Sequence, residues 1–273
     1  MSSADLSQGV GAVGRARVGV RTLRGGRDRW WLQPVLTVTG LSLWVIYAVV
    51  RTALQRNYWV ADYHYLSPFY SPCLTTSCAP GSSHLGTPFG NFPPLLPYAI
   101  LSLPFLLVFR LTCYYYRKAY YRSYYLAPPA CAVAEPHRTY HGETRFPLIL
   151  QNFHRWFFYA AVILSGINSY DAAVAFHGKG GGFGFGLGNL ILIANVILLW
   201  CYTLGCHSCR NIVGGRLRHF SKHPIRYWAW GKVSLLNGRH MQFAWFTLLS
   251  LAVTDAYIAF VAAGVFPDPR FIN

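Results

Sequence analysis

The sequence predicts an all-α, multi-pass membrane protein with five transmembrane helices. Hydrophobic residues make up 53% of its 273 residues and charged residues only 12%, whereas a soluble domain contains about 25% charged residues. The aromatic fraction of 17% is typical of the belts that tyrosine and tryptophan form at membrane surfaces. Five apolar segments are close to the roughly 20 residues that a membrane helix needs, namely 34–55, 95–116, 148–168, 187–205 and 241–264.

Residues 1–33 form a basic tail before the first predicted span. The tail contains six arginines and two aspartates, but no apolar run of the kind found in a secretory signal peptide. An organelle transit peptide would have a similar composition. We favour a cytoplasmic tail, because it ends in the pair Trp30 and Trp31, which suits the membrane surface.

The later spans show local signals of their own. The second contains Pro97 and Pro104 and is expected to kink, since proline removes a helical hydrogen bond. The fourth begins after a glycine-rich loop, 178–188. The fifth leads into a short external tail, 265–273.

Asp255 lies well inside the fifth predicted span. A carboxylate at this depth is costly unless it is paired or takes part in function. We therefore expect Asp255 to pair with Ser165 or Asn168 on the third span, the alternative being a proton relay.

Positive charge alternates from one loop to the next. Six Lys and Arg precede the first span, and loops 117–147 and 206–240 contain five and seven. Loops 56–94 and 169–186 and the C-terminal tail contain one each. Because short loops rich in Lys and Arg stay inside the cell, the N-terminus is predicted inside and the C-terminus outside. The net charge of +16 thus reflects membrane topology and not nucleic acid binding.

Loop 56–94 is then external and contains Cys73 and Cys78. An oxidising compartment favours a disulfide between them, two free thiols being the alternative. Three other cysteines are expected to be small apolar side chains or ordinary thiols: Cys113, Cys131 and Cys201.

Four residues with metal-binding side chains are predicted at one depth, at the cytoplasmic ends of three spans. His154 begins the third span, Cys206 and Cys209 follow the fourth, and His240 precedes the fifth. The spacing of the cysteines places both thiols on one side of a helix end. An interfacial role for each histidine is the alternative, and other histidines of the same loop could replace a ligand: His207, His219 and His223.

Two thiolates and two imidazoles fit more than one kind of centre. They suit tetrahedral zinc, and they suit a Rieske-type [2Fe–2S] cluster, in which two cysteines bind one iron and two histidines the other. Imidazole ligands raise the potential of such a cluster to roughly −150 to +300 mV, a range that allows quinone reduction. A haem b with His154 and His240 as axial ligands would leave the cysteines without a role.

Three segments carry a resemblance to a known family: Gln151–Trp156 (QNFHRW), Gly205–Arg210 (GCHSCR) and Gly238–Met241 (GRHM). On these segments, and over residues 95–264, the chain resembles the membrane-anchor subunit of succinate dehydrogenase and fumarate reductase. It is most similar to the cytochrome-b-like anchor of the actinobacterial, mycobacterial-type enzymes. Di-haem members of the wider family take histidines from more helices, whereas the first two spans here contain none. Members with a membrane-embedded Rieske-type cluster are the better match.

The resemblance implies a subunit of respiratory complex II in the plasma membrane. A flavoprotein subunit and an iron–sulfur subunit would dock on the cytoplasmic face. Electrons would pass from succinate through FAD and iron–sulfur clusters, the last a Rieske-type [2Fe–2S] centre in this chain, to a membrane quinone. The chain has no dinucleotide motif and few acidic residues, so it is not expected to oxidise succinate itself. The alternative from a different class of function is a non-redox membrane protein with a structural zinc ion at the same ligands.

A quinone site near the centre needs polar donors beside an apolar surface. The candidates at the cytoplasmic boundary are Arg155, Trp156, Tyr227, Trp230, Lys232 and Gln242. Arg155 and Trp230 are expected to be nearest the metal ligands. Each candidate is equally suited to anchoring the chain at the membrane surface. The tyrosine-rich inner loops would dock the partner subunits or contact lipid headgroups.

Overall fold

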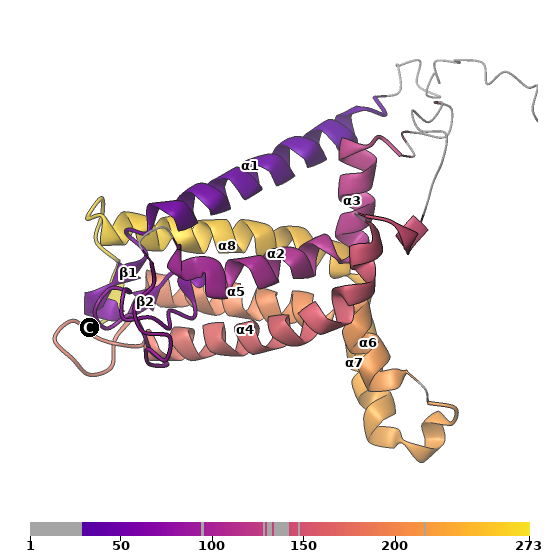
Figure 1. The fold of residues 1–273 in the computed structure, drawn as a ribbon. Helices are drawn as coiled ribbons and strands as arrows, with labels where there is room; N and C mark the ends of the chain where they lie inside the picture. Colours follow the sequence, from indigo (N-terminus) through magenta and orange to yellow (C-terminus); the bar gives the residue numbers. More distant parts are fainter. Residues whose placement is uncertain are drawn as a thin grey trace, which may run out of the picture.

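The computed structural model is a bundle of long helices with shorter elements at both ends (Figure 1). It describes residues 29–93, 96–127, 129, 133, 142–146, 148–215 and 217–273. The predicted basic tail, as far as residue 28, and Cys131 lie outside the described residues. Within the described part, four helical segments are long and apolar enough to cross a membrane: α1 (Leu32–Leu54), η5 with α4 (Leu148–Phe153 and His154–Val174), α5 (Leu187–Leu204) and α8 (His240–Ala262).

Helix α5 is the central element and packs against both α4 and α8. It has the highest mean hydropathy of the four, 1.9, which fits a helix surrounded by other helices and lipid. In α1, only 11% of the apolar window is buried, against 39% in each of the other three. Helix α1 therefore lies at the edge of the bundle, where its exposed leucine and valine side chains suit lipid contact.

The second predicted span, 95–116, is not one continuous helix. It consists of the 3-10 turn η3 (Tyr98–Leu101), the nine-residue helix α2 (Leu103–Leu111) and the start of α3 (Tyr114–Tyr124). Pro97 precedes η3 and Pro104 lies in the first turn of α2, so proline separates these pieces as expected, but it breaks the helix where a kink was predicted. Helix α2 still packs against α4 inside the bundle.

One end of the bundle, named here the α3 end, carries helices that turn away from the bundle axis. Cys113 has extended backbone angles and separates α2 from α3, which crosses the end of the bundle (Figure 1). Helices α6 (His207–Gly214) and α7 (Pro224–Gly238) pack on each other and project beyond the bundle. The 3-10 turns η4 (Gly142–Thr144) and η6 (Phe220–Lys222) belong to the connecting segments.

The opposite end, named the β end, carries short strands and the C-terminus (Figure 1). Strands β1 (Trp59–Val60) and β2 (Tyr65–Leu66) pair antiparallel, with Trp59 opposite Leu66, and the turn between them is η1 (Ala61–Tyr63). Strand β3 (Phe185–Gly186) pairs antiparallel with β4 (Arg270–Ile272), which fixes the C-terminal segment to the start of α5. The 3-10 turn η2 (Pro68–Tyr70) follows β2.

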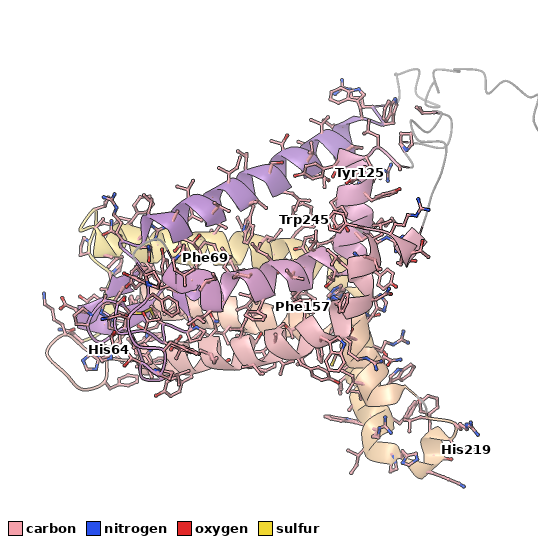
Figure 2. The ribbon with its side chains drawn as sticks, viewed as in Figure 1. His64, Phe69, Tyr125, Phe157, His219 and Trp245 are labelled. Carbon is pink, nitrogen blue, oxygen red and sulfur yellow. A yellow bond between two sulfur atoms is a disulfide. The ribbon has the colours of Figure 1, made fainter. Side chains whose placement is uncertain are left out.

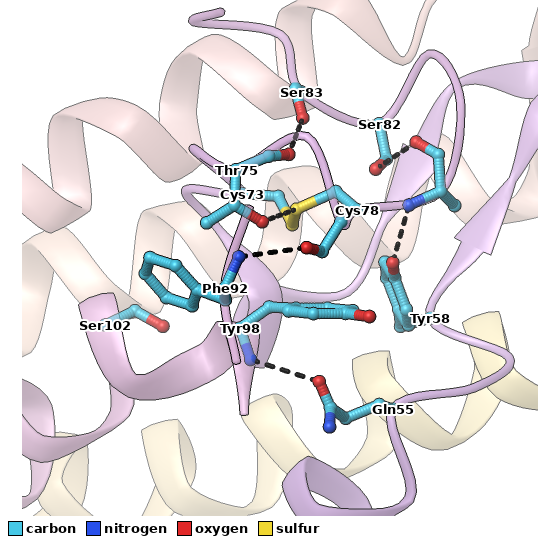
Figure 3. The surroundings of a disulfide bond; sticks show 12 residues. Gln55, Tyr58, Cys73, Thr75, Cys78, Ser82, Ser83, Phe92, Tyr98 and Ser102 are labelled. Atoms are coloured by element: carbon cyan, nitrogen blue, oxygen red, sulfur yellow. Dashed lines mark hydrogen bonds between the residues drawn. A yellow bond between two sulfur atoms is a disulfide. The ribbon is translucent and has the colours of Figure 1, made fainter. Parts of the chain in front are cut away.

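A disulfide joins Cys73 and Cys78 in the loop after η2, at the β end (Figure 3). The surrounding loop is held by hydrogen bonds from its backbone to polar side chains. Ala79 N donates to Tyr58 Oη at 2.7 Å, and Phe92 N donates to Ser77 Oγ at 3.0 Å. These bonds compensate for the loop's lack of regular secondary structure.

The predicted pairing of Asp255 with Ser165 or Asn168 is wrong. Its carboxylate is fully buried and accepts hydrogen bonds from Arg51 Nε (2.6 Å), Tyr47 Oη (2.6 Å) and Ser67 Oγ (2.6 Å). Helix α1 and the loop after β2 thus supply its partners in place of α4. An arginine is a stronger partner than a hydroxyl or an amide, because it compensates the charge of the carboxylate.

Gly188, in the first turn of α5, lets β2 pack directly against this helix. A Cβ atom at this position would lie 2.2 Å from Cε2 of Tyr65, a fully buried side chain that donates to Asp268 at 2.9 Å. We expect Gly188→Ala to lower the free energy of unfolding by about 1–3 kcal/mol, because the added methyl group displaces Tyr65. Unfolding in detergent, followed by circular dichroism, measures this change.

Gly166→Ala in α4 is the matched control for this prediction. A Cβ atom at Gly166 would meet nothing within 4 Å. Alanine is also the better helix former by about 1 kcal/mol. The control variant should be at least as stable as the parent protein, and an equal loss in both variants would contradict the packing argument.

Candidate metal centre

His154 is the first residue of α4 and lies buried at the α3 end of the bundle. Its Nε2 is 2.9 Å from Cys206 Sγ, and its Nδ1 is 2.8 Å from Thr112 Oγ1. The Thr112 hydroxyl donates its proton to the carbonyl oxygen of Val108 at 2.8 Å. The hydroxyl oxygen is therefore an acceptor for Nδ1–H of His154. This tautomer leaves Nε2, which faces the thiol, with the lone pair that binds a metal.

His240 is the first residue of α8 and is also buried. Its Nε2 is 3.3 Å from Cys113 Sγ, and its Nδ1 is buried without a hydrogen-bond partner. Gly205 leaves room for this ring, since a Cβ atom there would lie 3.3 Å from Nδ1 and 2.7 Å from a backbone oxygen of α5. Either nitrogen of His240 is thus available to bind a metal.

Aromatic rings hold both imidazoles in place. Phe109 is parallel to the His154 ring with centroids 4.9 Å apart, and Tyr202 is parallel to the His240 ring with centroids 4.8 Å apart. Phe109 and Tyr202 also contact each other edge to face. His154, fixed by this packing and by its hydrogen bond to Thr112, is pre-oriented for metal binding, whereas His240 is fixed by packing alone.

Cys206 and Cys209 begin the projecting hairpin of α6 and α7. Cys206 caps α6, accepting a hydrogen bond from Ser208 N at 3.3 Å, and Cys209 lies one turn further along. Both are buried in one apolar cluster, which also contains Cys113. Burial, with the nearby Cys113, raises the pKa of Cys206 to about 12, and burial raises the pKa of Cys209 as well. Each is therefore a neutral thiol unless a cation stabilises the thiolate.

All four predicted ligands are buried at the α3 end, but only His154 and Cys206 of the four are in direct contact. His154 meets Cys206, whereas His240 meets Cys113. Cys209 is buried in the same apolar cluster. No group of three or more His, Cys, Asp or Glu side chains in the described part of the chain already has metal-binding geometry. The ligand atoms are thus arranged as two pairs, each joining a thiol to an imidazole.

Cys113 was expected to be a small apolar side chain or an ordinary thiol, and the structure places its Sγ beside the imidazole of His240. It lies near the inner end of the second predicted span, at the same expected depth as the four chosen ligands. Unlike Cys206 and Cys209, it stands alone in the sequence, outside any paired-cysteine motif.

His207, the predicted rival ligand, is exposed and lines a cavity beside His154. His219 and His223 are also exposed and lie on the projecting hairpin, and Figure 2 shows His219 far from the bundle. His207 is therefore the one rival that the structure leaves near the centre.

A cavity of about 670 Å³ adjoins His154 at the α3 end. It contains two of the six predicted quinone-binding residues, Arg155 and Trp230. Arg155 hydrogen-bonds to Asn211 Oδ1, and the guanidinium carbon of Arg210 lies 4.8 Å from the Trp230 ring centroid. The other four candidates do not line this cavity: Trp156, Tyr227, Lys232 and Gln242.

A second, more apolar cavity of about 480 Å³ opens between α1, α2, α3 and α8. Its polar element is Arg110, which is buried and donates to Tyr116 Oη at 2.8 Å and to Thr247 Oγ1 at 3.1 Å. The Arg110 guanidinium carbon also lies 4.6 Å from the ring centroid of Tyr202, the residue that stacks on His240. Tyr202 therefore contacts both the buried cation of Arg110 and the candidate ligand His240.

Comparisons with known proteins agree with this arrangement of helices. A family model described as actinobacterial succinate dehydrogenase subunit SdhC matches residues 32–264. A chain of the Mycobacterium smegmatis Sdh1 complex in the apo form is 64% identical, with a TM-score of 0.87, covering 97% of this chain and 99% of that chain. Curated proteins give no match. The chain therefore belongs to the family of actinobacterial SdhC, the membrane subunit of succinate dehydrogenase.

Proposed function

We propose that this chain anchors succinate dehydrogenase in the plasma membrane and contains its last electron-transfer centre before quinone. A flavoprotein subunit and an iron–sulfur subunit would dock at the α3 end. His154, His240, Cys206 and one further thiol would hold a Rieske-type [2Fe–2S] cluster, which when bound supplies one-electron transfer to quinone. The observation that carries the proposal is the pairing of each imidazole with a buried thiol within 3.3 Å.

The residues present fit such a cluster in number and in chemistry. Two imidazoles and two thiols are the donors that a Rieske-type centre requires. His154 has its Nε2 lone pair free because Thr112 accepts from its Nδ1. The unpartnered Nδ1 of His240 is a buried polar atom that a ligand would satisfy.

The proposed topology has five crossings, with the N-terminus inside and the C-terminus outside. Four long apolar helices support four of the crossings, and η3 with α2 would provide the fifth within the bundle. The break between η3 and α2 is tolerated because Ser102 is fully buried there and its hydroxyl donates to the carbonyl oxygen of Phe69 at 2.8 Å. The α3 end, where α3, α6 and α7 carry the basic loops, would face the cytoplasm.

The quinone headgroup would bind in the cavity beside His154. Arg155 and Trp230 offer hydrogen-bond donors there, and Gln151 and Ser208 line the same cavity. Their role would be to bind the two quinone carbonyls and to hold the headgroup next to the metal ligands. Of the six residues predicted from the sequence, we retain Arg155 and Trp230 for this role.

The alternative of a haem b is less well supported by the geometry. Axial ligation requires the metal-binding nitrogens of His154 and His240 to face a porphyrin placed between them. Nε2 of each ring instead faces a thiol, at 2.9 Å and 3.3 Å. A single structural zinc would use the same two thiols and two imidazoles, so metal analysis separates it from a cluster.

Spectroscopy of the purified complex tests this proposal. We expect iron and acid-labile sulfide in excess of what the partner subunits hold, and a Rieske-type EPR signal after reduction at low temperature. Cys206→Ser should remove this signal. A Soret band with a reducible α-band would show that the centre is a haem and not a cluster. Zinc in place of the additional iron would indicate a structural site.

The same spectrum identifies the fourth ligand. Cys113→Ser and Cys209→Ser form a matched pair, because both remove a buried thiol from the same apolar cluster. The contact between Cys113 and His240 predicts that Cys113→Ser abolishes the signal and Cys209→Ser retains it. The opposite result would restore the ligand set predicted from the sequence.

A further inference from the structure

Three histidines from different segments lie together at the β end, opposite the candidate metal centre. His64 precedes β2, His84 lies in the loop after the disulfide, and His177 follows α4. The rings of His64 and His177 are parallel with centroids 3.9 Å apart, and the ring of His84 lies 6.1 Å from that of His64. Figure 2 shows His64 at this end of the bundle.

His84 is held in the manner typical of a metal-binding histidine. Its side chain is only 6% exposed, and its Nδ1 lies 2.7 Å from Oδ1 of the buried Asp171. Asp171 is itself fixed by a hydrogen bond from Ser71 Oγ. A carboxylate that accepts from one ring nitrogen sets the tautomer and leaves a lone pair on the other. That other nitrogen, Nε2, is buried and has no hydrogen-bond partner.

The backbone of His64 adds an independent observation. Its φ is 53° and its ψ is 35°, in the left-handed region that glycine adopts without strain. A non-glycine residue is uncommon in this region, and histidine is one of the residues that tolerate it. In this conformation the imidazole of His64 neighbours those of both His84 and His177.

We propose that His64, His84 and His177 bind a divalent transition metal ion of the Zn²⁺ or Cu²⁺ type, with Asp171 as a positioning residue. Imidazole is a preferred ligand of these ions. Two imidazoles on tetrahedral zinc, with Zn–N bonds of about 2.0–2.1 Å, have ring centres roughly 5 Å apart. This value lies between the two separations in the structure, 3.9 Å and 6.1 Å.

The site requires a small rearrangement when the ion binds. The described residues contain no group of three such side chains that already has metal-binding geometry. One of the two stacked rings, His64 or His177, must turn so that its nitrogen faces Nε2 of His84. Both are partly exposed at the β end, so an ion can reach them. His64 also stacks on Trp59, with centroids 5.4 Å apart, so His177 is the ring that would turn. The proposal is independent of the centre at the α3 end.

Titration of the intact complex with Cu²⁺ tests the site. The complex is kept oxidised, so that a Rieske-type cluster gives no EPR signal. We expect one tightly bound Cu²⁺ for each copy of the chain, with nitrogen hyperfine structure from imidazoles. Asp171→Asn should weaken binding by about 10–100-fold, and His84→Gln should weaken it at least as much. His219→Gln removes an exposed histidine at the other end of the molecule and should change nothing.

The unfolding midpoint of each variant, measured with and without Cu²⁺, separates loss of the site from a folding defect. Binding to the folded state raises the midpoint. The parent protein and His219→Gln should show this increase, and His84→Gln should not, whatever its midpoint without the ion. A Cu²⁺ signal and a midpoint increase that survive the combined replacement of His64, His84 and His177 by glutamine would overturn the proposal.

Discussion

Replacing His154 with alanine is expected to abolish quinone reduction while succinate oxidation by a soluble dye acceptor continues. The variant removes an imidazole whose Nε2 lies 2.9 Å from Cys206 Sγ. Loss of an outer hydrogen-bond partner at a metal site typically lowers metal affinity or activity by about 10–100-fold. Loss of a ligand should therefore lower the rate of quinone reduction by about 100-fold or more. His240→Ala should behave in the same way.

Two controls make this result specific to the electron path. Thr112→Val keeps the shape of the side chain but removes the acceptor for His154 Nδ1. The rate of quinone reduction should therefore fall by about 10-fold. His223→Ala changes an exposed histidine of the projecting hairpin and should leave both activities unchanged. Unchanged quinone reduction in His154→Ala would remove this residue from the path, and a parallel loss of dye reduction would indicate failed assembly.

Removing the Asp255 carboxylate is expected to have the largest effect on stability. Asp255 is fully buried and lies 2.6 Å from Arg51, whose side chain is only 11% exposed. Breaking a buried ion pair from one side typically costs about 3–5 kcal/mol, because the other charge is left uncompensated. Asp255→Leu should therefore lower the free energy of unfolding by that amount, measured by denaturant titration in detergent. It should also loosen α1 from α8.

The double variant Arg51→Leu with Asp255→Leu separates the stranded charge from the lost contacts. It removes both charges, so it should be more stable than Asp255→Leu alone. Lys179→Ala breaks the exposed pair between Lys179 and Asp62, 3.7 Å apart, and should change stability by less than about 1 kcal/mol. If the double variant were no more stable than Asp255→Leu, the loss would come from packing and not from an uncompensated arginine.

Hydropathy predicted the four long helices, because a helix that contacts lipid must be apolar along its whole length. It failed at the second span, where the composition is as apolar but Pro97, Pro104 and the extended Cys113 divide the chain. A mean hydropathy over about 20 residues does not register such local breaks. Whether a break kinks or ends a helix depends on the packing that satisfies its backbone, which a sequence does not contain.

The shared depth of His154, Cys206 and His240 could be predicted because each lies at or beside the end of a long helix, where depth follows from span boundaries. The contact between Cys113 and His240 could not be predicted, since the direction of a side chain depends on how its helix is rotated. The partners of Asp255 were missed for a related reason, because Ser67 lies in an irregular loop.

The proposed centre lies where three helices begin. Helix α4 starts at His154, α8 starts at His240, and Cys206 caps the start of α6. The aligned peptide dipoles of a helix give its N-terminus a partial positive charge of roughly half a unit. Three helices also end there, since α2 ends at Leu111, α5 at Leu204 and α7 at Gly238, and their negative C-terminal dipoles offset the positive N-terminal ones. The buried guanidinium of Arg110, which contacts the Tyr202 ring, is then the full positive charge nearest the ligands. A cation at this position favours thiolate over thiol and the electron-rich, reduced form of any cluster held there, so Arg110 would raise the midpoint potential of the centre.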